Sequence, residues 1–563
     1  MALRVAGFDF ARNWFERESL KGTDTVVADL TYDDLAFDWV VQQSDVIFRG
    51  IAHDILFVAL VAGILCVFGR TLFQIAVILL VAFLAANIEH IKYNFDHIQL
   101  STIGLGFDQT FIRGSLTRDV IKYAVVIAGA GVFGLVFGMQ RVLRPGAGYL
   151  AIAIVLAAFG YGFKTFPDAP DWMQTTPLLP IAPQQNLPTL AAKPPDQAVA
   201  WTAQPVRAVG QYNVLTVYLE GLSHASLERG DMRTLSSLAE QGVQFENYVS
   251  RQIITANGLY AAMTGDTPSF LRRFIKWEEM EADSQVAAQS LPRVFAEEGY
   301  QTSYLQSAQL GFMAKDAKLQ HMGFDDIRGD AAWDTAHSRN GWGVDDLTLI
   351  ENSLAEIDNL SVNGPWFVST LTTGTHSPYN VPGLDNPTRY DALQAADRAV
   401  SVLIEGLRAR DQLDNTVVII TSDEGRESTG RDGFLGDMAL NRLPLIVLHP
   451  DMEGAVITHN LLNTDLRDIT LLLSHQIDAD TFVKSLPLHE DIVFGNFITG
   501  KIFWYDAVEK SLAGCRTRSF DCQVWEDQAT LFGPTSDIPE RVHMPAFSQL
   551  IRAHDRVPVQ HSP

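Results

Sequence analysis

Acidic residues follow two apolar segments of the chain, at the point where each segment ends. Glu220 comes directly after "NVLTVYL", and Asp423 and Glu424 follow "NTVVIITS". Short runs rich in Val and Ile are typical of strands that are covered on both faces. Since parallel strands end at one edge of a sheet, we expect the three carboxylates to converge. Neighbouring carboxylates repel one another, and a bound cation usually resolves that repulsion. A solvated turn is the alternative for Asp423 and Glu424 taken alone.

Two further residues could do chemistry at the same edge. Thr255 precedes the helical pattern of "ANGLYAAMTG", and a helix start favours a phosphoryl group through its free amides and its dipole. The alternative for Thr255 is an ordinary N-cap. His376 follows "WFVSTLTT" and lies between a glycine turn and a proline. It could donate to a substrate oxygen or move a proton, whereas a lone histidine is more often a surface residue.

The elements that position these residues alternate along the chain. From about residue 210, strand-like apolar runs are separated by helical patterns, which predicts an α/β domain with a mostly parallel sheet covered by helices. Cys515 and Cys522 close a short loop in "CRTRSFDC". They predict a disulfide and an oxidising compartment, with free thiols as the alternative. The last sixty or so residues show no periodicity that predicts particular elements.

The first part of the chain predicts a membrane anchor. Four apolar stretches lie within about residues 48–166, each near the length of about 20 residues that spans a bilayer. No N-terminal signal peptide is visible. Arg70, Arg141 and Arg144 lie in the two tight turns between spans, which predicts cytoplasmic turns and both chain ends outside the cytoplasm. The net charge of −24 argues against a nucleic-acid partner.

These observations divide the chain into five predicted parts. In order they are a polar tail (1–47), a transmembrane domain of about four helices (48–166), a Pro-rich linker (167–206), an extracytoplasmic catalytic domain (207–500) and a C-terminal extension (501–563). We therefore expect a multi-pass protein of the inner (cytoplasmic) membrane with a periplasmic catalytic domain.

Several motifs in a fixed order resemble a known family. They are "YLEGLS", "TANGLYAAMTGDTPS", "RNGWGVDDL", "TLTTGTHSPY", "VVIITSDEG" and "NRLPLIVLHPD". In this order they are similar to the lipoteichoic acid synthase and membrane phosphoglycerol transferase family, of the alkaline phosphatase and sulfatase superfamily. The resemblance covers about residues 48–480. It implies a sulfatase-like α/β domain, a phospholipid donor (phosphatidylglycerol above others), a phospho-threonine intermediate, one divalent cation, and an extracytoplasmic glycan or lipid acceptor.

The resemblance also implies a metal site. Glu220, Thr255 and Asp423 resemble the family's metal ligands, and Thr255 also resembles its nucleophile. Glu424 stands where the family usually has a histidine, and is predicted here as a further ligand. A set of oxygen ligands suits Mn²⁺ or Mg²⁺ better than Zn²⁺.

The resemblance assigns substrate contacts as well. His376 resembles a substrate-binding histidine with a catalytic part, and Ser428 resembles a polar contact beyond the ligands. Met313 and Lys315 stand near where the family has a tryptophan and an arginine at the headgroup. Lys315 keeps the positive charge but lacks the bidentate fork of arginine.

Two other interpretations of the chain stay open. A phosphoethanolamine transferase shares the architecture and the threonine, but in its families the zinc site tends to be rich in histidine. A catalytically degenerate membrane scaffold is the other, because the family's histidine, tryptophan and arginine are replaced. An arylsulfatase is excluded, since "ITANG" offers no Cys or Ser in a C/S-x-P-x-R context.

Overall fold

A computed structural model of the chain describes residues 211–266, 289–426, 434–496, 501–516, 521–533 and 539–543. All of them belong to the second of the two compact units into which the chain divides. The predicted tail, transmembrane segments and linker, and also Ser428, lie outside the described residues. Among the described helices, none is long and apolar enough to cross a membrane.

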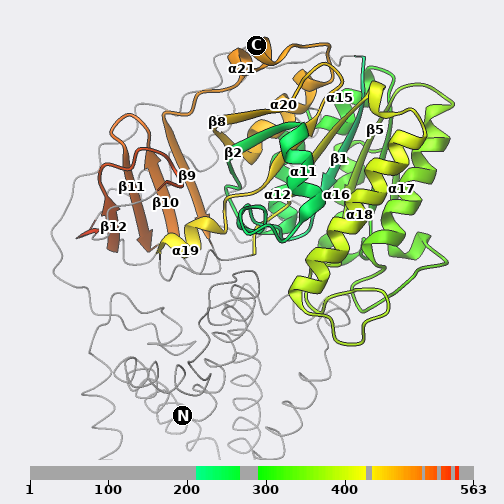
Figure 1. Cartoon of the computed structure of the whole chain (residues 1–563), viewed down its shortest axis with the longest axis horizontal. Coiled ribbons are helices and arrows are strands. Elements are labelled where there is room, and N and C mark those ends of the chain that lie inside the picture. The colour runs from blue at the N-terminus through cyan, green and yellow to red at the C-terminus, as the bar shows by residue number, and fades with distance from the viewer. Residues whose placement is uncertain are drawn as a thin grey trace, which may run out of the picture. The chain divides into compact units, whose positions relative to one another are not determined.

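An eight-stranded sheet lies at the centre of the described region, in the order β4-β3-β5-β1-β6-β7-β2-β8 (Figure 1). Neighbouring strands pair in parallel except at β7, which runs against both β6 and β2. The predicted α/β domain with a mostly parallel sheet is therefore confirmed for this region. The strands are β1 (Asn213–Tyr218), β2 (Val243–Val249), β3 (Gln301–Gln306), β4 (Asp326–Arg328), β5 (Trp366–Leu371), β6 (Thr416–Thr421), β7 (Leu445–Leu448) and β8 (Ala455–Leu462).

The three central strands β5, β1 and β6 are buried along their whole length. Their sequences are apolar almost without interruption because both faces of the sheet are covered. Side chains of β1 alternate between two separate cores. Val214 and Tyr218 belong to one, and Leu215 and Val217 belong to the other.

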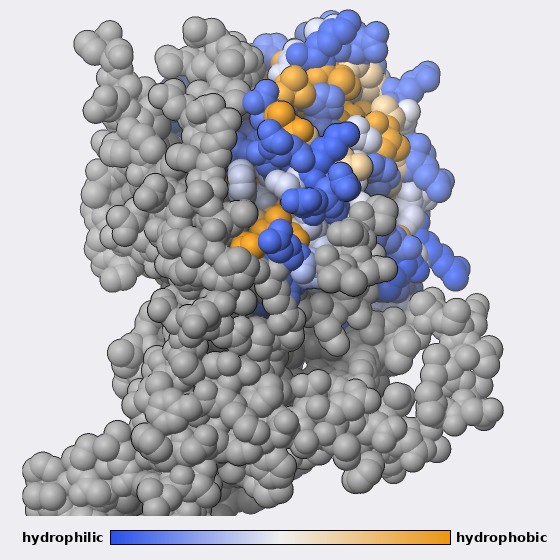
Figure 2. All heavy atoms as spheres, turned by 90° about the vertical axis from the view of Figure 1, so that its left-hand side faces the viewer, coloured by the Kyte–Doolittle hydropathy of each residue, from blue (hydrophilic) through white to orange (hydrophobic). Residues whose placement is uncertain are grey.

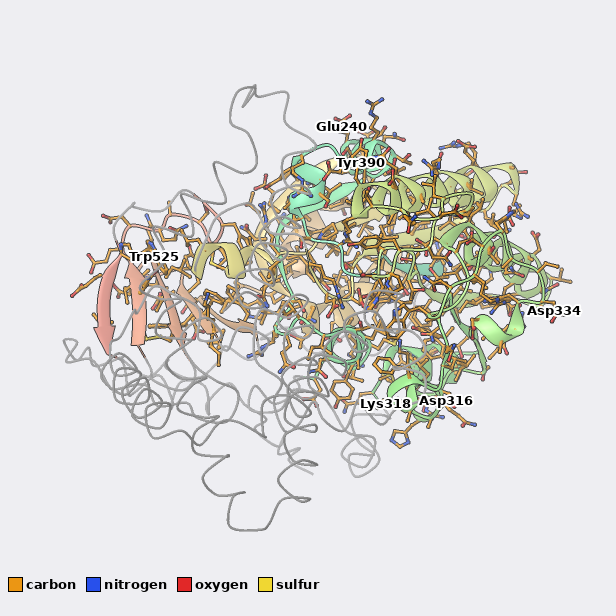
Figure 3. The ribbon with its side chains drawn as sticks, turned by 90° about the horizontal axis from the view of Figure 1, so that it is seen from below. Glu240, Asp316, Lys318, Asp334, Tyr390 and Trp525 are labelled. Atoms are coloured by element: carbon orange, nitrogen blue, oxygen red, sulfur yellow. A yellow bond between two sulfur atoms is a disulfide. The ribbon has the colours of Figure 1, made fainter. Side chains whose placement is uncertain are left out.

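Helices cover each face of this sheet. Figure 1 shows α17 and α18 side by side along one face, and Figure 3 shows Glu240 of α11 close to Tyr390 of α18 on that face. The helices of this face are α11 (Arg233–Gln241), α17 (Asp346–Ser361) and α18 (Arg389–Ala409). Those of the other face are α12 (Thr255–Thr264), α15 (Leu291–Glu297), α16 (Lys315–Met322), α20 (Leu466–Leu473) and α21 (Ala479–Ser485). Two short helices, α10 (Ala225–Glu228) and α19 (Phe434–Ala439), lie in connections.

A smaller antiparallel sheet follows, in the order β13-β12-β11-β10-β9. Cys515 on β11 lies opposite Cys522 on β12, and the two form the predicted disulfide. On the face drawn in Figure 2, hydrophilic side chains surround smaller hydrophobic areas of the described surface. The strands are β9 (Asp491–Asn496), β10 (Lys501–Asp506), β11 (Ser511–Arg516), β12 (Asp521–Trp525) and β13 (Glu540–His543).

The smaller sheet contacts the loop that leads into α12. Gln252 forms a parallel bridge with Gly495 of β9, and the Gly495 N–H donates to the carbonyl oxygen of Arg251 at 2.9 Å. The side-chain amide of Asn441 donates both to the carbonyl oxygen of Ser250 at 2.8 Å and to that of Gly495 at 3.1 Å. The start of α12 is therefore positioned by both sheets.

Candidate active site

The strand order brings the predicted acids together at one edge of the large sheet. β1 lies between β5 and β6, and Tyr218 at its end is in register with both Leu371 and Thr421. Glu220 lies two residues beyond β1, and Asp423 and Glu424 lie just beyond β6. All three residues are buried, with exposed fractions of 2%, 1% and 4%. The expected convergence of the carboxylates is what the structure shows.

Short hydrogen bonds join the ends of the three central strands. Ser422 Oγ donates to the carbonyl oxygen of Leu219 at 2.5 Å, and the Gly221 N–H donates to Asp423 Oδ1 at 3.0 Å. Thr375 Oγ1, in the loop after β5, donates to the carbonyl oxygen of Glu220 at 2.6 Å. These bonds fix the backbone segments that carry the carboxylates.

Glu220 and Asp423 carry oxygens that the protein itself does not satisfy. Glu220 Oε1 and Asp423 Oδ2 are buried and accept no hydrogen bond. Burial raises the pKa of Glu220 well above its ordinary value, the charges of Asp423 and Glu424 raise it further, and Arg426 opposes them. Unsatisfied buried carboxylate oxygens are costly unless a cation neutralises them. The pair therefore fits a divalent cation with oxygen ligands.

Acidic and histidine side chains do not complete such a site by themselves. Within the described ranges, no group of three or more His, Cys, Asp or Glu side chains is arranged to hold a metal ion. Thr255 could supply a further oxygen, since its Oγ1 lies 3.4 Å from Glu220 Oε2. A hydroxyl and the neighbouring carboxylates could thus offer oxygens to a cation.

Thr255 is the first residue of α12, which agrees with its predicted place near a helix start. The N-cap of this helix is Ile254, so Thr255 is not the N-cap. The backbone N–H of Thr255 donates a hydrogen bond to the Glu424 carboxylate. Gly258 allows the helix to approach this closely, because a Cβ at that position would lie 1.9 Å from the carbonyl oxygen of Asp423. Any larger residue would push α12 away from the acids.

Arg426 is a site residue that the sequence analysis missed. Its Nε and Nη2 lie 2.7 and 2.6 Å from Glu424 Oε1, and Nη2 also lies 3.7 Å from Glu220 Oε1. The side chain of Arg426 is 40% exposed, whereas the side chains of Glu220 and Glu424 are 3% and 6% exposed. The signal available in the sequence was a basic residue two positions after the acid pair, in "DEGR".

Lys315 brings a second positive charge to the same cluster. It begins α16, whose neighbouring Asp316 and Lys318 are labelled in Figure 3, and Lys315 itself is only 8% exposed. Burial lowers the pKa of Lys315, while the charges of Glu220, Asp423 and Glu424 oppose that shift. The predicted basic contact is thus within the electrostatic range of all three acids.

His376 lies in the loop after β5 with a defined tautomer. Its Nδ1 is 2.7 Å from the carbonyl oxygen of Ser377, and a carbonyl can only accept, so Nδ1 carries the proton. Burial lowers the pKa of His376 well below its ordinary value, and Arg426 adds to this, so the ring is neutral with a lone pair on Nε2. Trp342 packs on the ring at a centroid distance of 4.5 Å and donates its Nε1–H to Ser377 O at 3.2 Å.

Two other predicted contacts are not among the described side chains. Ser428 and the side chain of Met313 lie outside the described residues. Trp342, which belongs to the quoted motif "RNGWGVDDL", provides an aromatic ring beside His376 that the sequence analysis did not assign.

Comparison with known proteins gives a family match within the described region. Residues 213–465 match the family described as Sulfatase, so this part of the chain is similar to that family. The region that matches includes Glu220, Thr255, His376, Asp423 and Glu424.

Two relatives support the resemblance to the membrane phosphoglycerol transferases that the sequence motifs indicate. The chain is 22% identical over 424 residues to phosphoglycerol transferase I of Escherichia coli O127:H6, covering 65% of this chain and 52% of the relative. It is 23% identical over 406 residues to phosphoglycerol transferase I of Escherichia coli O81, covering 64% and 50%. The chain therefore spans about half the length of the curated relatives it matches.

A solved structure has the same fold. A protein of the alkaline phosphatase superfamily from Vibrio parahaemolyticus superimposes with a TM-score of 0.50 at 18% identity, covering 65% of this chain and 90% of that one. The two chains therefore share a fold over this region.

Proposed function

We propose that the chain is a membrane-bound, metal-dependent phosphotransferase that moves a phosphoglycerol group from a phospholipid to an extracytoplasmic glycan or lipid acceptor. The observation that carries this proposal is the placement of Thr255, at the start of α12, with its Oγ1 3.4 Å from Glu220 Oε2; the other oxygen of that carboxylate, Oε1, accepts no hydrogen bond. A hydroxyl at that place has a helix N-terminus for phosphoryl oxygens and acids that can hold a cation.

The relatives support the choice of headgroup. The two Escherichia coli proteins are named phosphoglycerol transferase I, which favours phosphatidylglycerol as donor. The predicted spans at 48–166 would keep the domain beside the bilayer that contains such a donor, in the inner membrane with the site outside the cytoplasm.

Glu220, Asp423 and Thr255 would hold the cation, and Glu424 was predicted to join them. Mn²⁺ or Mg²⁺ suits these oxygen donors better than Zn²⁺. When bound, the cation would lower the pKa of the Thr255 hydroxyl and stabilise negative charge on the phosphoryl oxygens.

Each transfer step exchanges one phosphorus–oxygen bond. In the first, Thr255 Oγ1 forms a bond to phosphorus while the bond to the diacylglycerol oxygen breaks, and the hydroxyl proton ends on the departing diacylglycerol. In the second, an acceptor hydroxyl attacks the phospho-threonine, and its proton passes to Thr255 as that side chain is released. The lone pair on His376 Nε2 can accept this proton on the way.

Intact-mass measurement with peptide mapping tests the proposal. The full chain is incubated with phosphatidylglycerol or phosphatidylethanolamine and Mn²⁺ or Mg²⁺, beside Thr255→Ala. We expect an adduct of phosphoglycerol mass on Thr255 that the variant lacks. Thr264→Ala is the matched control, because the Thr264 hydroxyl donates to Tyr260 O inside the same helix. A phosphoethanolamine adduct would change the headgroup, and no adduct with any donor would favour the scaffold.

A further inference from the structure

Glu424 and Arg426 form a close charge pair inside the site. Arg426 Nε and Nη2 both contact Glu424 Oε1, at 2.7 and 2.6 Å. The Thr255 N–H donates to the same carboxylate. Hydrogen bonds between charged groups are shorter and stronger than neutral ones, and the Glu424 side chain is only 6% exposed. Glu424 is therefore already neutralised and hydrogen-bonded by groups of the protein itself.

Glu220 and Asp423 are in the opposite situation. Glu220 Oε1 and Asp423 Oδ2 are buried and accept no hydrogen bond, and the Arg426 guanidinium approaches Glu220 Oε1 only to 3.7 Å. A cation bound at Glu424 Oε1 would have to displace Arg426 from that oxygen, and breaking a buried pair is costly because one charge is left without a partner. The three acids of the cluster therefore divide into two with a buried oxygen that accepts no hydrogen bond and one whose Oε1 already pairs with a cationic side chain.

Arg426 is placed between the acids and solvent. Its stem crosses Gly221, where a Cβ would lie only 2.9 Å from Arg426 Cδ. Gly221 has a positive φ of 62° as well, so a glycine suits this crossing for two reasons. The guanidinium reaches Glu424 and Glu220 on its buried side, while 40% of the side chain is exposed.

A guanidinium in this position has donors for a second anion. Arginine has five N–H donors in a rigid fork that matches phosphate oxygens. The contact with Glu424 uses Nε and Nη2, and the Nη1 donors are not part of that pair. Arg426 and the Thr255 N–H both contact the Glu424 carboxylate, so the guanidinium lies close to the start of α12.

We propose that Glu424 is a positioning residue that holds Arg426, instead of a ligand of the cation, and that Arg426 binds the phosphoryl oxygens of the donor. The cation would then be held by Glu220, Asp423 and the Thr255 hydroxyl. This revises the ligand set predicted from the sequence, and it rests on the proposed function only for the identity of the phosphoryl donor.

Titration calorimetry with Mn²⁺ alone tests the first half. The full chain in detergent is stripped of metal with a chelator and titrated, beside Asp423→Asn and Glu424→Gln. We expect Asp423→Asn to weaken Mn²⁺ binding about 100-fold or more and Glu424→Gln, which removes only a neighbouring charge, to weaken it about tenfold or less. An equal loss of Mn²⁺ affinity in the two variants would overturn the proposal.

Inorganic phosphate, titrated in saturating Mn²⁺, tests the second half. Arg426→Gln should weaken phosphate binding about tenfold or more, and Arg426→Lys should weaken it less. Arg410→Gln is the matched control, because Arg410 forms an exposed pair with Asp358 at 2.8 Å. Unchanged phosphate affinity in Arg426→Gln would contradict the assignment.

A double-mutant cycle separates positioning from a merely structural effect. If Glu424 acts through Arg426, Glu424→Gln weakens phosphate binding in the native background and has no further effect in Arg426→Gln. Additive losses would overturn the positioning role. None of these titrations requires group transfer, so an absent adduct on Thr255 would contradict the proposed function and leave this inference standing.

Discussion

Replacement of Asp346 by asparagine should change how the stability of the domain depends on pH. Asp346 is buried at the start of α17, and its Oδ1 accepts the N–H groups of Thr373 and Gly374 at 3.1 and 2.8 Å. These residues begin the loop that carries His376. Asparagine keeps an oxygen for both bonds, so the main change is the loss of a titrating group.

The magnitude follows from the pKa of this carboxyl. Burial raises the pKa of Asp346 from 3.8 to about 6, against the two backbone hydrogen bonds, which lower it. Below both pKa values, Asp346 is protonated in the folded and in the unfolded chain. Between them the folded state binds the proton more tightly, so native stability falls as the pH rises through this window. From about pH 4.5 to about pH 7.5 this one group costs about 2 kcal/mol.

Thermal unfolding of the full chain in detergent, followed by fluorescence across this pH range, measures the effect. The Tm of Asp346→Asn relative to the native protein should rise by about 3 °C or more between the acidic and the neutral end. Thr264→Ala, which removes no titrating group, should run parallel to the native protein throughout. Parallel curves for Asp346→Asn as well would refute the reasoning, since the buried carboxyl would then not be protonated in the folded state.

Three further changes test other contacts. Replacing Cys515 and Cys522 together by serine should cost about 2.5 kcal/mol, the loop-closure value for their sequence separation of 7, seen as a lower Tm that reducing agent no longer changes. Gly258→Ala places a methyl group 1.9 Å from a carbonyl oxygen in the loop after β6. This change should lower the free energy of unfolding by about 1–3 kcal/mol and weaken Mn²⁺ binding. An unchanged Tm would contradict this close approach. Trp342→Ala should slow adduct formation with Mn²⁺ affinity unchanged, and Trp342→Phe should restore part of the rate because a ring still packs on His376.

The central part of the fold could be predicted because its signals are local. Strands β1, β5 and β6 are continuous apolar runs, and each is followed by a polar residue of the site. Once the strands were taken as parallel, the meeting of Glu220 with Asp423 followed from the geometry of the sheet. The start of α12 at Thr255 followed from the helical pattern after it.

The remaining features depend on contacts between distant segments. Arg426 can reach Glu424 because Gly221, which has no side chain, leaves room for the stem of the arginine. Gly221 lies 205 positions before Arg426 in the sequence, and no spacing rule indicates that the two residues meet. The reversed direction of β7 and the strands β10–β13 were likewise not predicted. The small sheet has its own cores, but β11 (SLAGCR) lacks a continuous apolar run, although β10 (KIFWYD) is as long as β1 and holds four consecutive apolar residues.

Through the bridge between Gln252 and Gly495, the carboxyl-terminal sheet helps to position Thr255. A chain shortened to end before β9 would lose the donor to Arg251 O and one acceptor of the Asn441 amide, only a few residues before α12. The two sheets are therefore not interchangeable modules. Exchanging the smaller sheet with that of a relative would alter the approach of the hydroxyl to its substrate even if every acid at the edge of the larger sheet were kept.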